Sequence, residues 1–115
     1  MSLKLGKTMR MTICGVKVSL TDEVRSLVER RFQYALARFE HQLDSVRVTL
    51  RDLNGPRQGI DHECRVMAHL RNGSQVIVRE VQTNTPAAAS LAADRLVYSI
   101  GRAIDKRRRF EHTVP

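Results

Sequence analysis

Histidine and cysteine residues are the side chains of this chain whose types and spacing could bind a metal ion. His62 and Cys64 alternate on a stretch that is typical of a strand, so both would point to the same face. A structural metal site needs four ligands, usually in CxxC or HxxxH pairs, and the sequence contains neither spacing. We therefore expect no metal and no cofactor, and we interpret Cys14 and Cys64 as small apolar core residues.

Catalytic motifs are also missing from the sequence. GxxxxGK[ST], GxGxxG, GxSxG and HExxH do not occur. Glu80 is the one acid in an unusual place, because its position in an alternating strand puts it on the side of the apolar residues. Without a partner for acid–base chemistry, Glu80 is expected to reach solvent at an edge or end of a sheet. We predict that the protein is not an enzyme and has no small-molecule substrate.

Arginine carries most of the remaining chemistry. The 115 residues contain 20 Lys+Arg against 12 Asp+Glu, with a net charge of +8, and Arg outnumbers Lys sixteen to four. Guanidinium groups form bidentate contacts with phosphates, and a field of this sign attracts nucleic acid or anionic lipid. No apolar stretch has the ~20 residues of a membrane span, and no secretory signal is recognisable. We expect a cytoplasmic protein without a membrane partner. Aromatic residues are scarce, so stacking surfaces for single strands are poorly supplied.

Helical spacing gathers part of the positive charge near the C-terminus. At 100° per residue the last helix has an apolar face on one side and a row of basic residues on the other. These basic residues are spaced seven, four and three positions apart, and we call them the basic stripe: Arg95, Arg102, Lys106 and Arg109. Asp94 and Asp105 fall off this stripe, so we expect almost no compensating acid on it. Unpaired like charges at helical spacing are mildly destabilising, which favours an external anion over a merely solvated face.

Two further arginine groups accompany the stripe. The first helix presents Arg30, Arg31 and Arg38 beside its apolar face. Alternation in the strands places a third group on the open face of the sheet, as a possible secondary RNA surface: Arg47, Arg51, Arg65 and Arg79. The predicted RNA-binding residues are therefore Arg30, Arg31, Arg38, Arg95, Arg102, Lys106 and Arg109.

The elements that must position these residues follow from periodicity. Thr21 is a predicted N-cap, and alternation of apolar and polar residues predicts strands. The expected elements are a strand over 9–16, a helix from about 22 to about 40, a strand over 44–53, a loop over 54–59, a strand over 64–70, a two-residue turn at Asn72-Gly73, a strand over 75–83 and a helix from about Pro86. This order, β-α-β-β-β-α, predicts an α+β fold with a four-stranded sheet and two helices on one face. Residues 1–8 are interpreted as an N-terminal extension or cloning residues, 9–110 as a single domain and 111–115 as a short tail.

Three stretches of the chain are similar to a known family. They are MTICGVKVSLTDEVRSLVERRF, SVRVTLRD and NTPAAASLAADRLVYSI, with Asp94-Arg95-Leu96 at the D-K-L position of a family motif. In this order and spacing, over about Arg10 to Arg109, the chain resembles the ribosome hibernation promoting factor and ribosome-associated inhibitor family. It departs from that pattern at Tyr34 and Tyr98, where the family carries basic residues.

The resemblance implies a fold like that of double-stranded-RNA-binding domains and a translation inhibitor that acts under stress and in stationary phase. Such a protein binds rRNA of the small ribosomal subunit in the decoding channel and sterically blocks mRNA and tRNA. The basic sites carried over from the family are Arg31, Arg95 and Arg102. The resemblance also implies the short family form, without the C-terminal dimerisation domain and monomeric off the ribosome. Two alternatives stay open, a generic duplex-RNA-binding module and a protein-interaction or transcription-modulating module.

Overall fold

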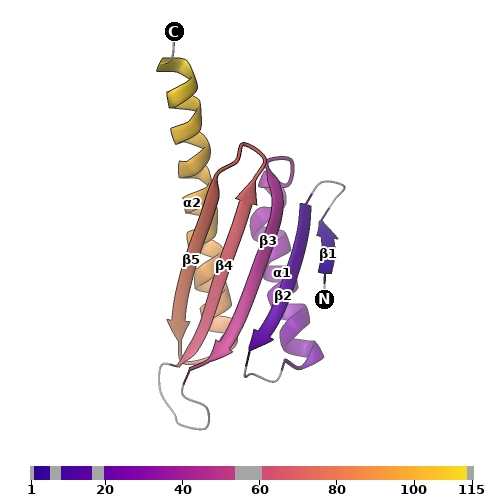
Figure 1. Ribbon diagram of the computed structural model, residues 1–115. Helices are drawn as coiled ribbons and strands as arrows, with labels where there is room; N and C mark the ends of the chain where they lie inside the picture. Colours follow the sequence, from indigo (N-terminus) through magenta and orange to yellow (C-terminus); the bar gives the residue numbers. More distant parts are fainter. Residues whose placement is uncertain (1, 6–8, 17–19, 54–60, 114–115) are drawn as a thin grey trace.

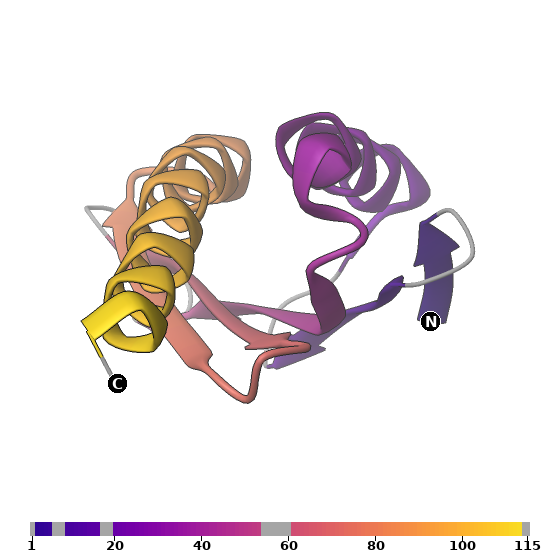
Figure 2. The same cartoon turned by 90° about the horizontal axis from the view of Figure 1, so that it is seen from above.

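The computed structural model describes residues 2–5, 9–16, 20–53 and 61–113, with side chains over 9–16, 20–53 and 61–108. It contains a five-stranded sheet and two long helices (Figure 1). The elements are β1 (Ser2–Leu5), β2 (Met9–Val16), α1 (Asp22–Leu36), the 3-10 turn η1 (Ala37–Phe39), β3 (Leu43–Asp52), β4 (His62–Leu70), β5 (Gln75–Gln82) and α2 (Thr85–Thr113). Strands β2 and β3 are parallel, and all other neighbours are antiparallel. Both helices cover one face of the sheet and leave the other open (Figure 2).

This architecture confirms the predicted α+β fold with the order β-α-β-β-β-α. The structure adds β1, which pairs with β2 at the edge of the sheet and lies within the segment that the sequence left outside the fold. The predicted loop over 54–59 lies outside the described residues.

The core lies between the sheet and the helices, and strand alternation builds the sheet side of it. In β3 the apolar residues Val46, Val48 and Leu50 are fully buried, and the residues between them turn to the open face. The same period runs through β2, β4 and β5. Because side chains of a strand point alternately to opposite faces, this pattern assigns the residues between the buried apolar positions to the open face.

Helix α1 begins where the sequence predicts and ends earlier. The Oγ1 atom of Thr21 accepts a hydrogen bond from the Val24 backbone N–H at 3.2 Å, which caps the helix. Val28, Phe32 and Leu36 are buried against the sheet. The helix was expected to reach residue 40, but it ends at Leu36 and continues as the tighter turn η1, because the chain must bend to bring the buried Leu43 into β3.

The connection between β4 and β5 is longer than the predicted two-residue turn. The backbone N–H of Leu70 bonds to Ser74 O at 2.9 Å, and Gly73 N–H bonds to Leu70 O at 3.0 Å. Gly73 adopts a left-handed φ of 92°, and Asn72 Oδ1 accepts from the Ser74 N–H at 2.8 Å. A β-turn followed by a left-handed glycine therefore closes a three-residue loop, which is the next most common hairpin connection.

Helix α2 is capped by Asn84, whose Oδ1 accepts from the Ala87 N–H at 2.8 Å. Its predicted apolar face is confirmed. Ala89, Ala92, Ala93, Leu96 and Ile100 are buried, and Ala103 and Ile104 pack partly against the core. At 29 residues the helix is about 44 Å long, and its last turns extend beyond the sheet (Figure 1). Residues 105–108 are exposed on every side of it. Neither of the described helices is both long and apolar enough to cross a membrane.

The two cysteines have different environments. Cys64 is fully buried, as predicted, and burial first, then the charges of Glu63 and Glu80, raise the pKa of its thiol to about 12. The prediction of a core position for Cys14 is wrong. Met9, Met11 and Ile13 occupy the helix-facing positions of β2, so alternation puts the half-buried Cys14 on the open face.

Candidate nucleic-acid interface

The helix layer, meaning the outer surface of α1 and α2, carries most of the predicted RNA-binding residues. From the basic stripe, Arg95, Arg102 and Lys106 are exposed on α2. The side chain of Arg109 lies outside the described residues, although its backbone continues the helix. On α1, Arg30 is exposed and Arg31 is half-buried, and Arg38 is exposed on the turn η1 that follows.

A groove of about 1070 Å³ runs between the two helices. It brings together the three arginines of α1 and η1 and the polar edge of α2. Its lining residues are Leu27, Arg30, Arg31, Tyr34, Ala35, Ala37, Arg38, Ser90, Asp94 and Val97. Apolar walls with guanidinium groups on them suit a ligand that has both flat apolar parts and negative charge.

Arg31 spans this groove and is held by α2. Its Nε donates to Ser90 Oγ at 3.3 Å and its Nη2 to Ser90 O at 3.5 Å. Nη2 also forms an ion pair with Asp94, whose side chain is 65% exposed against 28% for Arg31. Arg31 therefore fixes the two helices relative to each other, and only part of its guanidinium faces solvent.

Arg95 is also paired, which corrects the expectation of a stripe without compensating acid. Its Nη1 lies 2.8 Å from Glu80 Oε1. Glu80 was expected to reach solvent at an edge, and β5 is an edge strand. The Glu80 side chain instead turns to α2 and is only 17% exposed. Sequence reasoning missed this pair because its partners lie on different elements.

The other cations of the helix layer are more available. Arg102 lies over the Tyr98 ring, 5.8 Å from its centroid, and Arg38 lies over the Phe39 ring at 4.8 Å. Within the described part of the chain, no carboxylate forms an ion pair with Arg30, Arg102 or Lys106. These three side chains can meet external phosphates without first breaking an internal pair.

The open face of the sheet carries the third arginine group, all four exposed as predicted: Arg47, Arg51, Arg65 and Arg79. Arg65 and Arg79 lie directly opposite each other in the β4–β5 register, an arrangement that is destabilising for like charges. The mostly buried Glu63 offsets it through an ion pair with Arg79. Because the helices cover the other face (Figure 2), this group and the helix layer point in opposite directions and form two separate surfaces.

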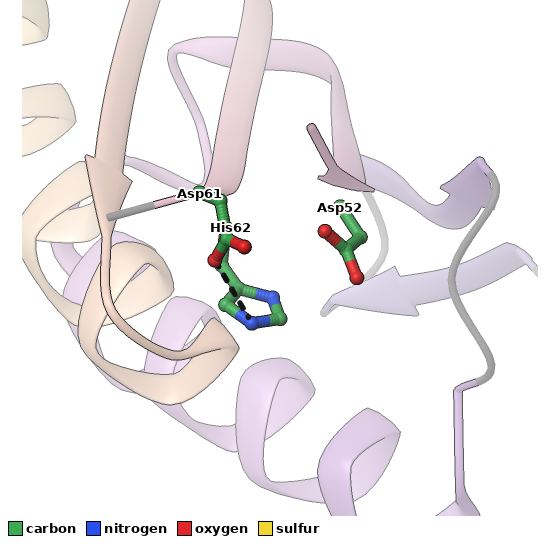
Figure 3. Close-up of side chains that lie close together, drawn as sticks. All are labelled: Asp52, Asp61 and His62. Atoms are coloured by element: carbon green, nitrogen blue, oxygen red, sulfur yellow. Dashed lines mark ion pairs between the residues drawn. The ribbon is translucent and has the colours of Figure 1, made fainter. Parts of the chain in front are cut away.

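Asp52, Asp61 and His62 form a small cluster at one end of β3 and β4 (Figure 3). Their ligand atoms lie within 4.8 Å of one another, which is close enough to consider a cation. The buried Asp61 carboxylate is however only 3.4 Å from His62 Nε2, and His62 Nδ1 lies 3.5 Å from the Thr85 hydroxyl. Strand alternation predicts that His62 and Cys64 point to the same face, but the fully buried Cys64 takes no part in this cluster. The contacts of His62 with Asp61 and Thr85 explain why these side chains lie close together, without a bound cation.

Comparisons with known proteins agree with this geometry. The N-terminal domain of Protein Y from Thermus thermophilus is 26% identical, with 79% of this chain and 93% of that chain covered at a TM-score of 0.63. A ribosomal subunit interface protein from Coxiella burnetii shares the fold at 11% identity, with 83% and 97% covered and a TM-score of 0.67. No curated protein matches the sequence. The family model for Sigma 54 modulation protein / S30EA ribosomal protein matches residues 11–108. The chain therefore belongs to the Sigma 54 modulation protein / S30EA ribosomal protein family.

Proposed function

We propose that this protein is a cytoplasmic translation inhibitor that binds rRNA of the small ribosomal subunit through its helix layer. The observation that carries the proposal is that exposed cations of the helix layer, among them Arg30, Arg102 and Lys106, form no ion pair with the described residues, in a fold from a ribosome-associated family. Likeness to the Thermus Protein Y domain and to a ribosomal subunit interface protein supports the choice of the ribosome as partner.

The proposed mechanism is electrostatic and steric. Arginine and lysine side chains of the helix layer neutralise rRNA phosphates in the decoding channel, and the release of counterions supplies affinity. The folded body, 57 × 27 × 18 Å in extent, then occupies space that mRNA and tRNA need. No chemical step is required of it, in keeping with a non-catalytic family. We propose that it acts as a monomer.

Cosedimentation with small ribosomal subunits tests this proposal with two matched variants. One variant combines Arg30→Glu, Arg102→Glu and Lys106→Glu on the helix layer. The other combines Arg47→Glu, Arg51→Glu and Arg65→Glu on the open face. Each substitution replaces a positive charge by a negative one and lowers the net charge by two, so both variants fall from a net charge of +8 to +2.

The helix-layer variant should lose binding, and the open-face variant should keep most of it. If about six phosphates are contacted, log K for the unmodified protein should fall with log salt at a slope of roughly −4 to −5. Equal loss in both variants would mean that net charge, not the helix layer, determines binding. Retained binding by the helix-layer variant would refute the proposed surface.

The two alternatives make different predictions in the same assay. A generic duplex-RNA binder reads the shape of the A-form helix, so arbitrary RNA duplexes should compete with ribosomes at similar concentrations. A second function, suggested by the family description, is modulation of the transcription factor sigma 54. Binding to a protein partner of that kind should be insensitive to the helix-layer reversals.

A further inference from the structure

The two tyrosines of the chain lie in unusually exposed positions for large aromatic residues. Tyr34 is 86% exposed and Tyr98 is 66% exposed. An aromatic ring of this size buries 150–250 Å² when it packs, so leaving both rings in water forgoes a large favourable term. Neither hydroxyl group has a hydrogen-bond partner among the described residues. Neither ring packs into the core, and the one ring contact among the described residues is that of Arg102 with Tyr98. Both tyrosines lie on the helix layer.

Their placement relates them to the groove. Tyr34 lines the groove on α1, one turn after Arg31, and Tyr98 follows Asp94 by one turn on α2. Helices α1 and α2 run in the same direction (Figure 1). With a rise of 1.5 Å per residue, Tyr34 lies about 4.5 Å beyond Arg31 and Tyr98 about 6 Å beyond Asp94, on the same side of the Arg31–Asp94 pair.

The charge around the rings identifies the class of ligand. Arg30 and Arg38 line the groove beside Tyr34, and Arg102 lies over Tyr98. A positively charged wall with exposed aromatic faces matches single-stranded nucleic acid, in which a phosphate accompanies each base. Bases inside an A-form duplex are stacked on one another and offer no free face to a side chain. A duplex therefore makes use of the arginines alone, while an unpaired strand makes use of both kinds of group.

We propose that Tyr34 and Tyr98 are stacking sites for unpaired RNA bases, so that the helix layer prefers RNA with splayed-out nucleotides over regular duplex. This inference rests on the proposed function and specifies which part of an rRNA the surface recognises. It also modifies the expectation from composition, because Tyr34 in the groove and the exposed Tyr98 on α2 supply stacking surfaces in spite of a low total of aromatic residues.

Tyrosine fluorescence offers a direct test, because the chain has two Tyr and no Trp. In Tyr34→Phe only Tyr98 emits, in Tyr98→Phe only Tyr34 emits, and phenylalanine keeps a ring that can stack. Each variant is titrated at low salt with three 12-nucleotide probes: a single-stranded oligouridine, an abasic strand with the same phosphates, and a perfect RNA duplex. The oligouridine should quench both emitting rings, whereas the abasic strand and the duplex should bind with little quenching.

Affinity supplies the second readout. Tyr34→Leu and Tyr98→Leu should each weaken oligouridine binding roughly 5- to 150-fold and leave abasic-strand binding unchanged. Since both rings are exposed, folding is not at risk, and thermal unfolding monitored by circular dichroism checks this. Equal affinity for oligouridine and abasic strand, without quenching, would overturn the stacking sites and leave phosphate binding intact. Failure of the unmodified protein to bind any of the three probes would overturn the RNA-binding function as well.

Discussion

The buried thiol of Cys64 makes the stability of this protein depend on pH in the alkaline range. Its side chain has no exposed surface, and its pKa is raised from an ordinary value of 9.0 to about 12 by burial, Glu63 and Glu80. Between these two pH values the folded thiol keeps its proton while the unfolded thiol loses it. The unfolded state then binds fewer protons than the native state, so the free energy of unfolding falls as pH rises.

The size of this effect follows from the two pKa values. From about pH 8 to about pH 10 the unfolded thiol goes from mostly protonated to mostly ionised, and the folded thiol hardly changes. The difference lowers the free energy of unfolding by about 1 to 2 kcal/mol. The total pH dependence also contains contributions from other groups. These contributions are shared with a variant that lacks only the buried thiol.

Urea unfolding of the reduced protein and of Cys64→Ala, at pH 8 and at pH 10, isolates the thiol. The alanine variant is expected to be less stable at pH 8, because it loses buried volume, and to approach the unmodified protein at pH 10. Cys14→Ala is the matched control and should keep the unmodified pH dependence, since Cys14 lies half-exposed on the open face. Parallel pH dependence of Cys64→Ala and the unmodified protein would refute the reasoning.

Three further predictions concern single side chains. Thr21→Ala removes the acceptor for the Val24 N–H and should lower the free energy of unfolding by about 1 kcal/mol; urea unfolding measures it, and Thr21→Ser should restore the stability. Gly73→Ala places a Cβ on a residue with φ of 92°, and no other atom lies within 4 Å of that Cβ. The variant should therefore lose only the conformational cost, about 1 to 2 kcal/mol in the free energy of unfolding. A larger loss in thermal unfolding would contradict a purely conformational cost. Glu80→Gln frees Arg95 from its ion pair. It should change the free energy of unfolding by less than about 1 kcal/mol and raise ribosome cosedimentation at a fixed salt concentration. Weaker ribosome binding would show instead that the pair positions Arg95 for RNA.

The sequence predicts the fold well, because its elements follow simple periods. Val46, Val48 and Leu50 alternate with polar residues, and this alone assigns the two faces of β3. The same rule, applied to β2, would have placed Cys14 on the open face, beside Thr12 and away from Ile13. The interpretation of Cys14 as a core residue relied on composition instead of alternation.

The candidate site was less predictable, because its electrostatics depend on pairs between different elements. Helical spacing correctly gathers Arg95, Arg102 and Lys106 on one side of α2. It contains no information about Glu80, which reaches Arg95 from β5, or about the contact of Arg31 with Asp94 across the groove. Which of the arginines are free to bind phosphate becomes visible only after the helices are packed on the sheet.

The parallel pairing of β2 with β3 has a kinetic consequence. Arg10 pairs with Ser45 in this ladder, so the partners lie 35 positions apart in the sequence, whereas β4 and β5 meet across a short turn. Early closure of a long loop is costly in chain entropy, and contacts between distant residues slow folding. We expect the β3–β5 meander to gain hydrogen-exchange protection first during refolding, with β2 joining only after α1 has formed. Until then the backbone N–H and C=O groups along the β2-facing edge of β3 remain unpaired, and in this interval a newly made chain is most prone to pair with another copy.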